Sequence, residues 1–239
     1  MKYLIIGNGV AGTEAALTLK KILPENDVSI VTDSNERFYF RPRLVECLGT
    51  DFDYDRIFVH DDDYFKKKNI TIHYGCKVLS IDRRGKQVHC ASNLSFSYDQ
   101  LLIASGASPF VPPIHNTAVN GFFTLRTIED AKKINAYCTN SDHVVIAGGG
   151  LLGLECAHSL LKTAKRVTVV ESEPYLLQRQ LDGEGGIYLA NRLKQTGLEF
   201  IFNDRIVTLE GGSSLERVVL QSGGAITASA LIMSTGIRS

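Results

Sequence analysis

The sequence predicts an α/β protein built from two successive βαβ units. Three observations predict this fold: a glycine-rich segment occurs twice, each copy follows a short apolar run, and each copy opens a segment with helical periodicity. A second run of β-branched residues follows each helical segment. This order of strand, helix and strand is that of a parallel unit.

The composition is that of a folded globular chain. Of its 239 residues, 44% are hydrophobic and 22% are charged, so enough apolar surface can be buried to offset the loss of conformational entropy. Lysine and arginine together number 26, as do aspartate and glutamate, which leaves no basic footprint for a nucleic acid or an anionic membrane. Neither a signal peptide nor a long apolar stretch is evident, so we expect a cytoplasmic protein without membrane contact.

The internal repeat aligns residues 6–16 with residues 147–157, which lie 141 positions later. Three glycines, one glutamate and one alanine coincide between the two copies. In the first copy the expected elements are strand 3–6, helix 10–21 and strand 28–32. In the second copy they are strand 144–147, helix 151–165 and strand 167–170.

Each half continues with short alternating segments that predict a three-stranded antiparallel insertion. These segments are residues 77–81, 87–90 and 95–98 in the first half, and 205–209, 217–220 and 225–228 in the second. Each half then closes on an apolar strand and a turn of small residues, at 101–106 and 231–236. A proline-rich stretch, 108–121, lies between the halves, and we place the domains at residues 1–112 and 113–239.

The two glycine-rich segments have the spacing and context of dinucleotide-binding loops in Rossmann-like units. The first glycine permits a tight turn, the second lets the backbone approach a pyrophosphate, and the third lets the helix pack closely on its strand. These glycines are Gly7, Gly9 and Gly12 in the first loop and Gly148, Gly150 and Gly153 in the second. Two glycine-rich turns that bind nothing are the alternative, which the duplication disfavours.

An acidic residue follows the second strand of each unit. Asp33 lies 21 residues after Gly12, and Glu171 lies 18 residues after Gly153. Both carboxylates are expected to accept hydrogen bonds from ribose hydroxyls. Glu171 would also repel a 2′-phosphate, and no arginine follows in residues 172–174 to neutralise one. The second site is therefore expected to prefer NADH to NADPH.

The cysteines and histidines do not form a disulfide or metal-binding pattern. The five cysteines are an odd number at wide spacings: Cys47, Cys76, Cys90, Cys138 and Cys156. The six histidines have no second histidine or cysteine at ligand spacing, so no metal site is expected. Residues 60–63, His-Asp-Asp-Asp, precede a segment that ends in lysines and are expected to begin a helix.

With the duplicated loops, the Ile-Ala-Ser-Gly-Ala turn at 103–107 and the Leu-Arg-Thr segment at 125–127, the chain resembles the FAD-dependent pyridine-nucleotide-disulfide oxidoreductases over essentially its whole length. The resemblance implies FAD in the first unit and NAD(P)H in the second, with the second domain inserted into the first. It implies FAD contacts at Gly7, Gly9, Val10, Ala11, Gly12, Asp33, Val78, Ala104, Ser105 and Gly106. It implies nicotinamide-nucleotide contacts at Gly148, Gly150, Leu151, Leu152, Gly153, Glu155 and Glu171.

Two further segments narrow the resemblance. Residues 38–46, Phe-Tyr-Phe-Arg-Pro-Arg-Leu-Val-Glu, and 178–182, Gln-Arg-Gln-Leu-Asp, are similar to segments of NADH:rubredoxin oxidoreductases and of the flavin part of nitrite reductase. This similarity implies that Arg41 lies near the flavin phosphates or ring edge and that Pro42 packs on the isoalloxazine. Without it, Arg41 and Arg43 would be interpreted as solvated charges beside a proline turn. For 178–182, a salt bridge at a helix start stays open as the alternative.

The resemblance also indicates the reaction. Disulfide reductases of the family carry two redox cysteines where residues 41–46 stand, and the NADH oxidase and coenzyme A-disulfide branch carries one; neither pattern occurs here. The implied route is hydride from NADH to FAD, then single electrons to a small electron-transfer protein or a fused redox domain. Glu155 and Arg41 are the implied catalytic residues. Because Glu14 holds the place of Glu155 in the first copy, a helix-surface charge is the alternative for Glu155.

Two other functions compete with this interpretation. A thiol-dependent NADH oxidase would use Cys47, which we expect instead to be a buried structural thiol, since nothing nearby except Arg43 would lower its pKa. The second competing function is that of a nucleotide-binding module without catalysis. In members of the family, the sequence after the inserted domain completes the FAD domain. The chain ends at Ser239 before such a segment, so we expect a fragment or truncated product with an incomplete FAD-binding domain at 1–112.

Overall fold

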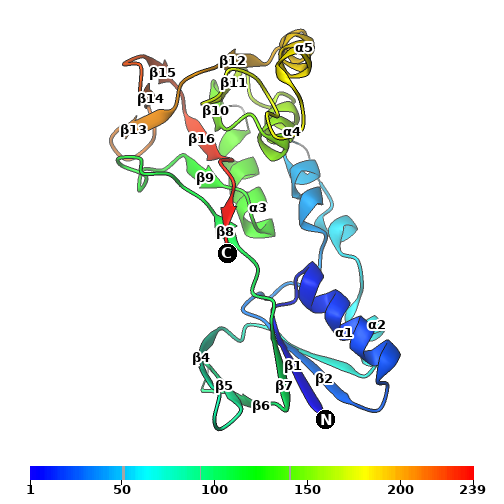
Figure 1. The fold of residues 1–239 in the computed structure, drawn as a ribbon. Helices are drawn as coiled ribbons and strands as arrows, with labels where there is room; N and C mark the ends of the chain where they lie inside the picture. Colours follow the sequence, from blue (N-terminus) through cyan, green and yellow to red (C-terminus); the bar gives the residue numbers. More distant parts are fainter. Residues whose placement is uncertain (50–51, 92, 140) are drawn as a thin grey trace. The chain divides into compact units, whose positions relative to one another are not determined.

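The computed structural model describes residues 1–49, 52–91, 93–139 and 141–239. The chain forms two compact units (Figure 1). The first comprises residues 1–40 and 55–107, and the second comprises residues 41–54 and 108–239. Within the described ranges, no helix is long and apolar enough to span a membrane.

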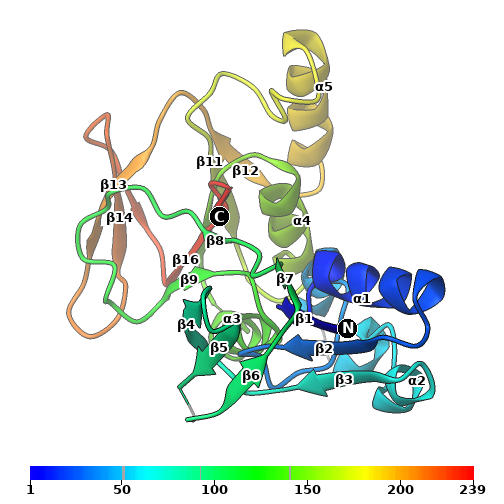
Figure 2. The same cartoon turned by 60° about the horizontal axis from the view of Figure 1, so that its bottom comes forward.

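A parallel sheet with the strand order β3-β2-β1-β7 forms the centre of the first unit (Figure 2). Its strands are β1 (Lys2–Ile6), β2 (Asp27–Val31), β3 (Ile70–His73) and β7 (Gln100–Ile103). Helix α1 (Val10–Ile22) follows β1, and the short α2 (Asp62–Lys67) precedes β3. The register places Ile5 opposite both Ile30 and Leu102, which confirms the parallel βαβ order predicted from the apolar runs.

Different elements cover the two faces of this sheet. Successive side chains of a strand point to opposite faces, so neighbouring residues of β1 pack in different clusters. Ile5 packs in one buried cluster with Ala16 of α1. Leu4 and Ile6 pack in another with Val88. Val88 belongs to an antiparallel sheet of β4 (Val78–Asp82), β5 (Gln87–Cys90) and β6 (Ser95–Ser97). The first predicted three-stranded insertion is thereby confirmed.

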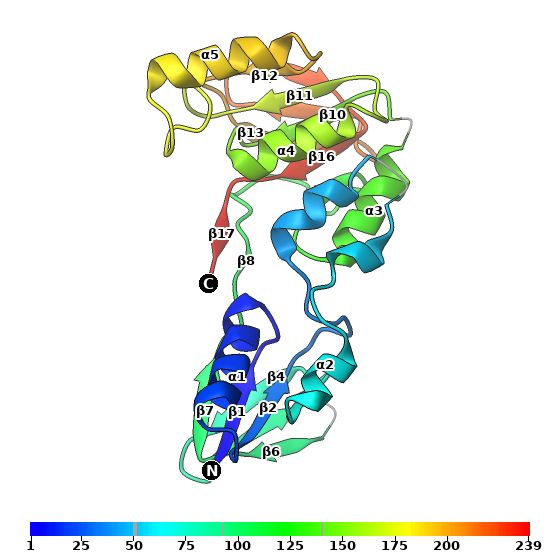
Figure 3. The same cartoon turned by 90° about the vertical axis from the view of Figure 1, so that its right-hand side faces the viewer.

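The second unit repeats this arrangement around a parallel sheet with the order β12-β11-β10-β16-β9 (Figure 3). Its strands are β9 (Phe122–Thr124), β10 (Val144–Ala147), β11 (Val167–Val170), β12 (Glu199–Ile201) and β16 (Ala230–Met233). Its helices are α3 (Ile128–Cys138), α4 (Leu151–Leu160) and α5 (Gly183–Lys194). Every residue of β10, β11 and β16 is buried, which explains why these strands are continuous apolar runs in the sequence.

A second antiparallel sheet packs on the second unit, as predicted. It consists of β13 (Ile206–Glu210), β14 (Arg217–Leu220) and β15 (Ala225–Thr227). Leu209 and Val218 of this sheet share a buried cluster with Val145, Leu231 and Met233 of the parallel sheet. Both halves therefore have the predicted architecture.

Side chains at the starts of three helices explain several polar residues of the sequence. Thr127 and Asp130 form a reciprocal capping box at the start of α3. Asp61 accepts the N–H of Tyr64 at the start of α2, so the acidic run at 60–63 begins a helix as expected. Asp182 accepts the N–H of Gly185 and begins α5.

The main difference from the predicted boundaries lies at the end of the helix after the second loop. Helix α4 ends at Leu160 instead of residue 165, because the chain turns back so that the Lys165 N–H donates to the carbonyl of Ser141 before β11 begins. The closing strands end at Ile103 and Met233, ahead of their small-residue turns, as predicted.

Four short elements remain in the described ranges. They are the 3₁₀ helices η1 (Arg41–Cys47) and η2 (Tyr54–Ile57), and the antiparallel pair β8 (Ser108–Pro109) and β17 (Ile237–Arg238). Residues 41–54 belong to the second unit although the sequence on both sides of them belongs to the first. The domain boundary that the proline-rich stretch predicts after residue 112 stays a prediction.

Candidate nucleotide-binding sites

The first glycine loop joins β1 to α1 and is too tight for side chains. Gly7 has a φ of +106°, and a Cβ there would lie 2.3 Å from the carbonyl oxygen of Ala104. A Cβ on Gly12 would lie 1.9 Å from the carbonyl oxygen of Gly7. Gly9 is the N-cap of α1 and has no side chain to occupy the helix terminus, so a pyrophosphate can approach the N–H groups of the first turn.

The turn after β7 lies directly beside this loop. The Ala104 N–H donates to the carbonyl of Ile6 over 2.8 Å, which continues the pairing of β7 with β1. The turn then passes through Ser105 and Gly106, which are exposed, and Gly106 has a φ of +79°. The structure therefore brings the predicted FAD residues at 104–106 to the predicted loop at 7–12.

The second glycine loop repeats this geometry between β10 and α4. Gly148 has a φ of +110°, and its Cβ would lie 2.6 Å from the carbonyl oxygen of Ser234. A Cβ on Gly153 would lie 2.0 Å from the carbonyl oxygen of Gly148. Gly150 is the N-cap of α4, with nothing within 4 Å of its Cβ position. Ser234, which follows β16, was not among the predicted contacts, although its place after the closing strand is that of Ala104.

Glu171 is held against the second loop by three hydrogen bonds. Its Oε2 accepts the N–H of Gly149 over 2.6 Å, and its Oε1 accepts the N–H of Glu173 over 3.0 Å and the hydroxyl of Ser172 over 3.1 Å. A carboxylate has about four lone-pair sites, so these donors leave capacity for a ribose hydroxyl. The acid predicted to recognise ribose thus lies at the loop with its orientation fixed.

The first loop is stabilised differently, by a neutral amide. Asn8 stands where Gly149 stands in the second loop, and it is 8% exposed. Its Oδ1 accepts the hydroxyl of Thr32, and its Nδ2 donates to the carbonyl of Glu36, each over 3.0 Å. Asp33 follows β2 and is exposed, where a ribose could reach it. This role of Asn8 was not predicted. The only feature of the sequence that indicates it is a polar residue between two obligatory glycines.

The structure shows where the other predicted contact residues lie in the fold. Glu155 is exposed on α4, as Glu14 is on α1, so both loops have a carboxylate one turn into the following helix. Val78 begins β4 in the first unit and is half-buried. Arg41 and Pro42 begin η1 in the second unit. The roles of these residues toward a nucleotide stay predictions.

Cys47 has the environment of a structural thiol. Its side chain is fully buried, and its Sγ lies 3.7 Å from the carbonyl oxygen of Arg43. Burial above all, with a further contribution from Glu46, raises the pKa of the Cys47 thiol to about 11, although Arg43 opposes the shift in part. The reactive thiolate is therefore scarce at neutral pH, which argues against a thiol-dependent reaction.

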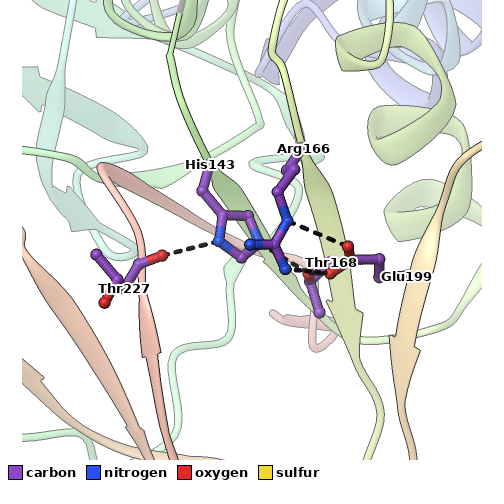
Figure 4. A network of polar contacts seen from close by, with 5 residues as sticks. All are labelled: His143, Arg166, Thr168, Glu199 and Thr227. Carbon is purple, nitrogen blue, oxygen red and sulfur yellow. Dashed lines mark hydrogen bonds and ion pairs between the residues drawn. The ribbon is translucent and has the colours of Figure 1, made fainter.

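A separate polar network lies at the opposite end of the second sheet (Figure 4). His143 Nδ1 lies 2.8 Å from the carbonyl oxygen of Thr227, and Nε2 lies 2.8 Å from the hydroxyl of Thr168. Thr168 donates to Glu199 over 2.8 Å, and Arg166 binds the same carboxylate through Nε and Nη2. The network joins the amino ends of β10, β11 and β12, whereas the glycine loop follows the carboxyl end of β10. It supports the sheet rather than the predicted nucleotide site.

Within the described part of the chain, no group of three histidine, cysteine, aspartate or glutamate side chains is arranged to hold a metal ion. All five cysteines are free thiols, and all are buried.

Two parallel βαβ units, each with a glycine-capped helix terminus, define a protein with two dinucleotide-binding folds. The chain belongs to the pyridine nucleotide-disulphide oxidoreductase family, whose model matches residues 1–239. This membership confirms the resemblance predicted from the duplicated loops.

Individual relatives match almost the whole of this chain. The chain is 30% identical to a nitrite reductase [NAD(P)H] of Bacillus subtilis, covering 99% of this chain and 30% of the relative. It is 30% identical to an NADH-rubredoxin oxidoreductase of Clostridium acetobutylicum, covering 99% of this chain and 58% of the relative. The solved structure of an NAD-dependent persulfide reductase from A. fulgidus superposes with a TM-score of 0.94 at 28% identity, covering 100% of this chain and 46% of the reductase. The chain thus spans less than two thirds of each of these proteins.

Proposed function

We propose that this chain is the nucleotide-binding part of an FAD-dependent NADH oxidoreductase. The observation that carries the proposal is the pair of glycine loops, each between a parallel strand and a helix capped by glycine. At Gly7 and Gly148 a Cβ would collide with the neighbouring backbone, so each loop offers bare peptide groups to a diphosphate. Membership of the family supports the assignment of one loop to each cofactor.

FAD, when bound, accepts a hydride from NADH and releases electrons singly to an acceptor. The first loop, with Ala104 beside it, would hold the FAD diphosphate, and Asp33 would bind its adenosine ribose. The second loop would hold the NADH diphosphate, and Glu171 would bind the ribose. Arg41 and Glu155 would orient the flavin and the nicotinamide.

Glu171 also favours NADH over NADPH in this proposal. Its carboxylate is already fixed at the loop by the Gly149 N–H, so it cannot easily turn away from a 2′-phosphate. The neighbouring Ser172, Glu173 and Pro174 add no positive charge. NADPH would therefore place like charges together at the ribose.

The acceptor in this proposal is a small electron-transfer protein or a fused redox domain. The names of the rubredoxin and nitrite reductase relatives support both forms. The burial of Cys47 supports direct electron transfer over a thiol-dependent oxidase. The balanced charge supports neither a nucleic acid nor a membrane as partner, and we place the protein in the cytoplasm.

The test is anaerobic addition of NADH to the FAD-loaded protein. We expect the visible flavin absorption to bleach and to return when a rubredoxin-type acceptor is added. NADPH at the same concentration should bleach the band more slowly. A protein that binds NADH and never bleaches would be a non-catalytic nucleotide-binding module and would contradict the proposal.

A further inference from the structure

The segment that carries Arg41 and Pro42 is fastened to the second unit. This anchored segment consists of residues 41–49 and 52–54, and η1 forms its first part. Helix η1 packs against both α3 and α4 (Figure 3). A stretch that leaves the first unit and returns to it is thereby held by two helices of the other unit.

One side chain of α3 binds this segment at three places. Asn135 Nδ2 donates to the carbonyl of Cys47, at the end of η1, and to the hydroxyl of Tyr54 over 3.3 Å. Asn135 Oδ1 accepts the N–H of Gly49 over 2.9 Å. A carboxamide has two N–H groups and one carbonyl oxygen, so both donors and the acceptor of Asn135 are directed at the anchored segment.

Helix α4 fixes the same segment from another direction. Gly49 has a φ of +69°, and a Cβ there would lie 2.1 Å from the carbonyl oxygen of Ser159, near the end of α4. Cys47 and Leu48, on either side of this contact, are fully buried. The close approach requires glycine, both for its backbone conformation and for lack of space.

A cation–π contact adds to the attachment. The Lys132 ammonium of α3 lies 5.1 Å from the centre of the Tyr54 ring. Lys132 and Asn135 are three residues apart on one helix, so both face the same end of the anchored segment. The segment is therefore held through polar, steric and cation–π contacts that converge on Cys47 to Tyr54.

We propose that Asn135 is a positioning residue that fixes Arg41 and Pro42 relative to the NADH-binding unit. The proposal rests on the function proposed above, in which Arg41 and Pro42 contact the flavin. Arg41 and Cys47 are the two ends of one 3₁₀ helix. Release of the Cys47 end would therefore move the Arg41 end as well. Asn135 touches neither cofactor and acts through the anchored segment.

The experiment compares Asn135→Leu and Asn135→Asp with a control, Asn191→Leu, in the FAD-loaded protein. Asn135→Leu removes all three hydrogen bonds at similar volume, whereas Asn135→Asp keeps the acceptor for Gly49. Asn191 is an exposed amide on α5 outside the proposed site, so its replacement controls for loss of a helical asparagine. Hydrogen exchange by mass spectrometry reports on peptides covering residues 41–54 and, separately, the strands β10 and β11.

We expect Asn135→Leu to accelerate exchange of the 41–54 peptide about tenfold, with β10 and β11 unchanged, since the variant removes three of the contacts that oppose local opening of the segment. Asn135→Asp should give an exchange rate between those of the wild type and Asn135→Leu, and Asn191→Leu should leave the rate unchanged. Gly49→Ala should release the same peptide by a steric route. Unchanged exchange in both Asn135→Leu and Gly49→Ala would overturn the anchor.

The second readout separates positioning from simple stability. We expect Asn135→Leu to slow flavin reduction by NADH about tenfold and to shift the flavin absorption band, while the Kd for NADH stays unchanged. Faster exchange with an unaltered flavin band and reduction rate would overturn the positioning role. A wild-type protein whose bound FAD is never reduced by NADH would refute the function proposed above, and with it the role of the segment, while the exchange data would still report the anchor.

Discussion

Two side chains stabilise the two glycine loops in chemically different ways. Glu171 presents a carboxylate to the Gly149 N–H, whereas Asn8 uses a neutral amide between Thr32 and Glu36. A carboxylate beside a nucleotide ribose discriminates against a 2′-phosphate, and an amide bound on both sides does not. The duplicated loops therefore share a backbone geometry and differ in the side chains that stabilise them.

At this scale, replacement of Glu171 by alanine should weaken NADH binding and leave FAD binding unchanged. Loss of a charged acceptor removes about 1.5 to 3 kcal/mol, which corresponds to about a 10- to 150-fold rise in the Kd for NADH. Fluorescence titration with each nucleotide measures both constants. Glu184→Ala, at an exposed position of α5, is the control. An equal loss of both cofactors would contradict the assignment of one loop to each.

His143 makes the stability of the second unit sensitive to acid. Burial lowers the pKa of His143 below its ordinary value of 6.5; the carbonyl of Thr227 and Glu199 oppose this shift, and Arg166 adds to it. A histidine with a lowered folded-state pKa binds its proton more readily when unfolded. Its contribution to stability is complete above pH 6.5 and is lost as the pH falls below that value.

The expected result is a steeper loss of thermal stability below pH 6.5 in the wild type than in His143→Gln, which cannot titrate. Circular dichroism melts across the pH range measure the difference. His158→Gln, an exposed histidine of α4, should retain the wild-type slope. Parallel slopes for the wild type and His143→Gln would show that His143 is not the titrating group.

In each βαβ unit, the packing of the helix on its strand depends on a single glycine. Gly12 and Gly153 each lie where a Cβ would meet the carbonyl oxygen of the first loop glycine, at 1.9 and 2.0 Å. The contact is with backbone, which cannot rotate away as a side chain can. Each βαβ unit therefore tolerates no side chain at the third glycine of its loop.

We expect Gly12→Ala to abolish FAD binding and to destabilise the first unit, by about 1 to 3 kcal/mol as in other overpacked sites. The helix must move off β1, which distorts the pyrophosphate approach, while the second loop is untouched and NADH binding persists. Flavin content after purification and NADH titration measure the two effects. Gly212→Ala, where nothing lies within 4 Å, is the matched control. Normal flavin content in Gly12→Ala would refute the placement of FAD at the first loop.

The whole molecule consists of two compact units with separate buried clusters. Ile5 and Ile30 belong to one cluster, and Val145 and Leu231 belong to another. Units with their own cores can unfold separately. A ligand that binds one folded unit then stabilises that unit by mass action.

Differential scanning calorimetry should accordingly show two transitions for the chain. NADH at one hundred times its Kd should stabilise one of them by about 2.7 kcal/mol, and FAD should act on the other. Glu171→Ala should remove the effect of NADH alone. A single transition that both ligands shift together would mean that the units unfold as one.

Strands β3, β9 and β12 of the parallel sheets appear only in the structure. The sequence alone predicted the two loops, the other three strands of each parallel sheet and both antiparallel insertions. Each depends on apolar periodicity and glycine spacing among residues within about one βαβ unit of each other. Glu171 was predicted from its place after the second strand of the repeat, and Cys47 was predicted as a buried thiol because only Arg43 nearby would lower its pKa. Family membership was likewise readable from motifs that are short and local.

Only the tertiary structure decided which unit holds residues 41–54, and which side chains stabilise the loops and the sheet. Asn135 and Cys47 are 88 positions apart, Asn8 and Thr32 are 24 apart, and Thr168 and Glu199 are 31 apart. A hydrogen bond between distant segments requires a polar group at each end but no periodicity along the chain. Such contacts arise when packed elements bring their termini together, so they leave no pattern from which a single sequence could predict them.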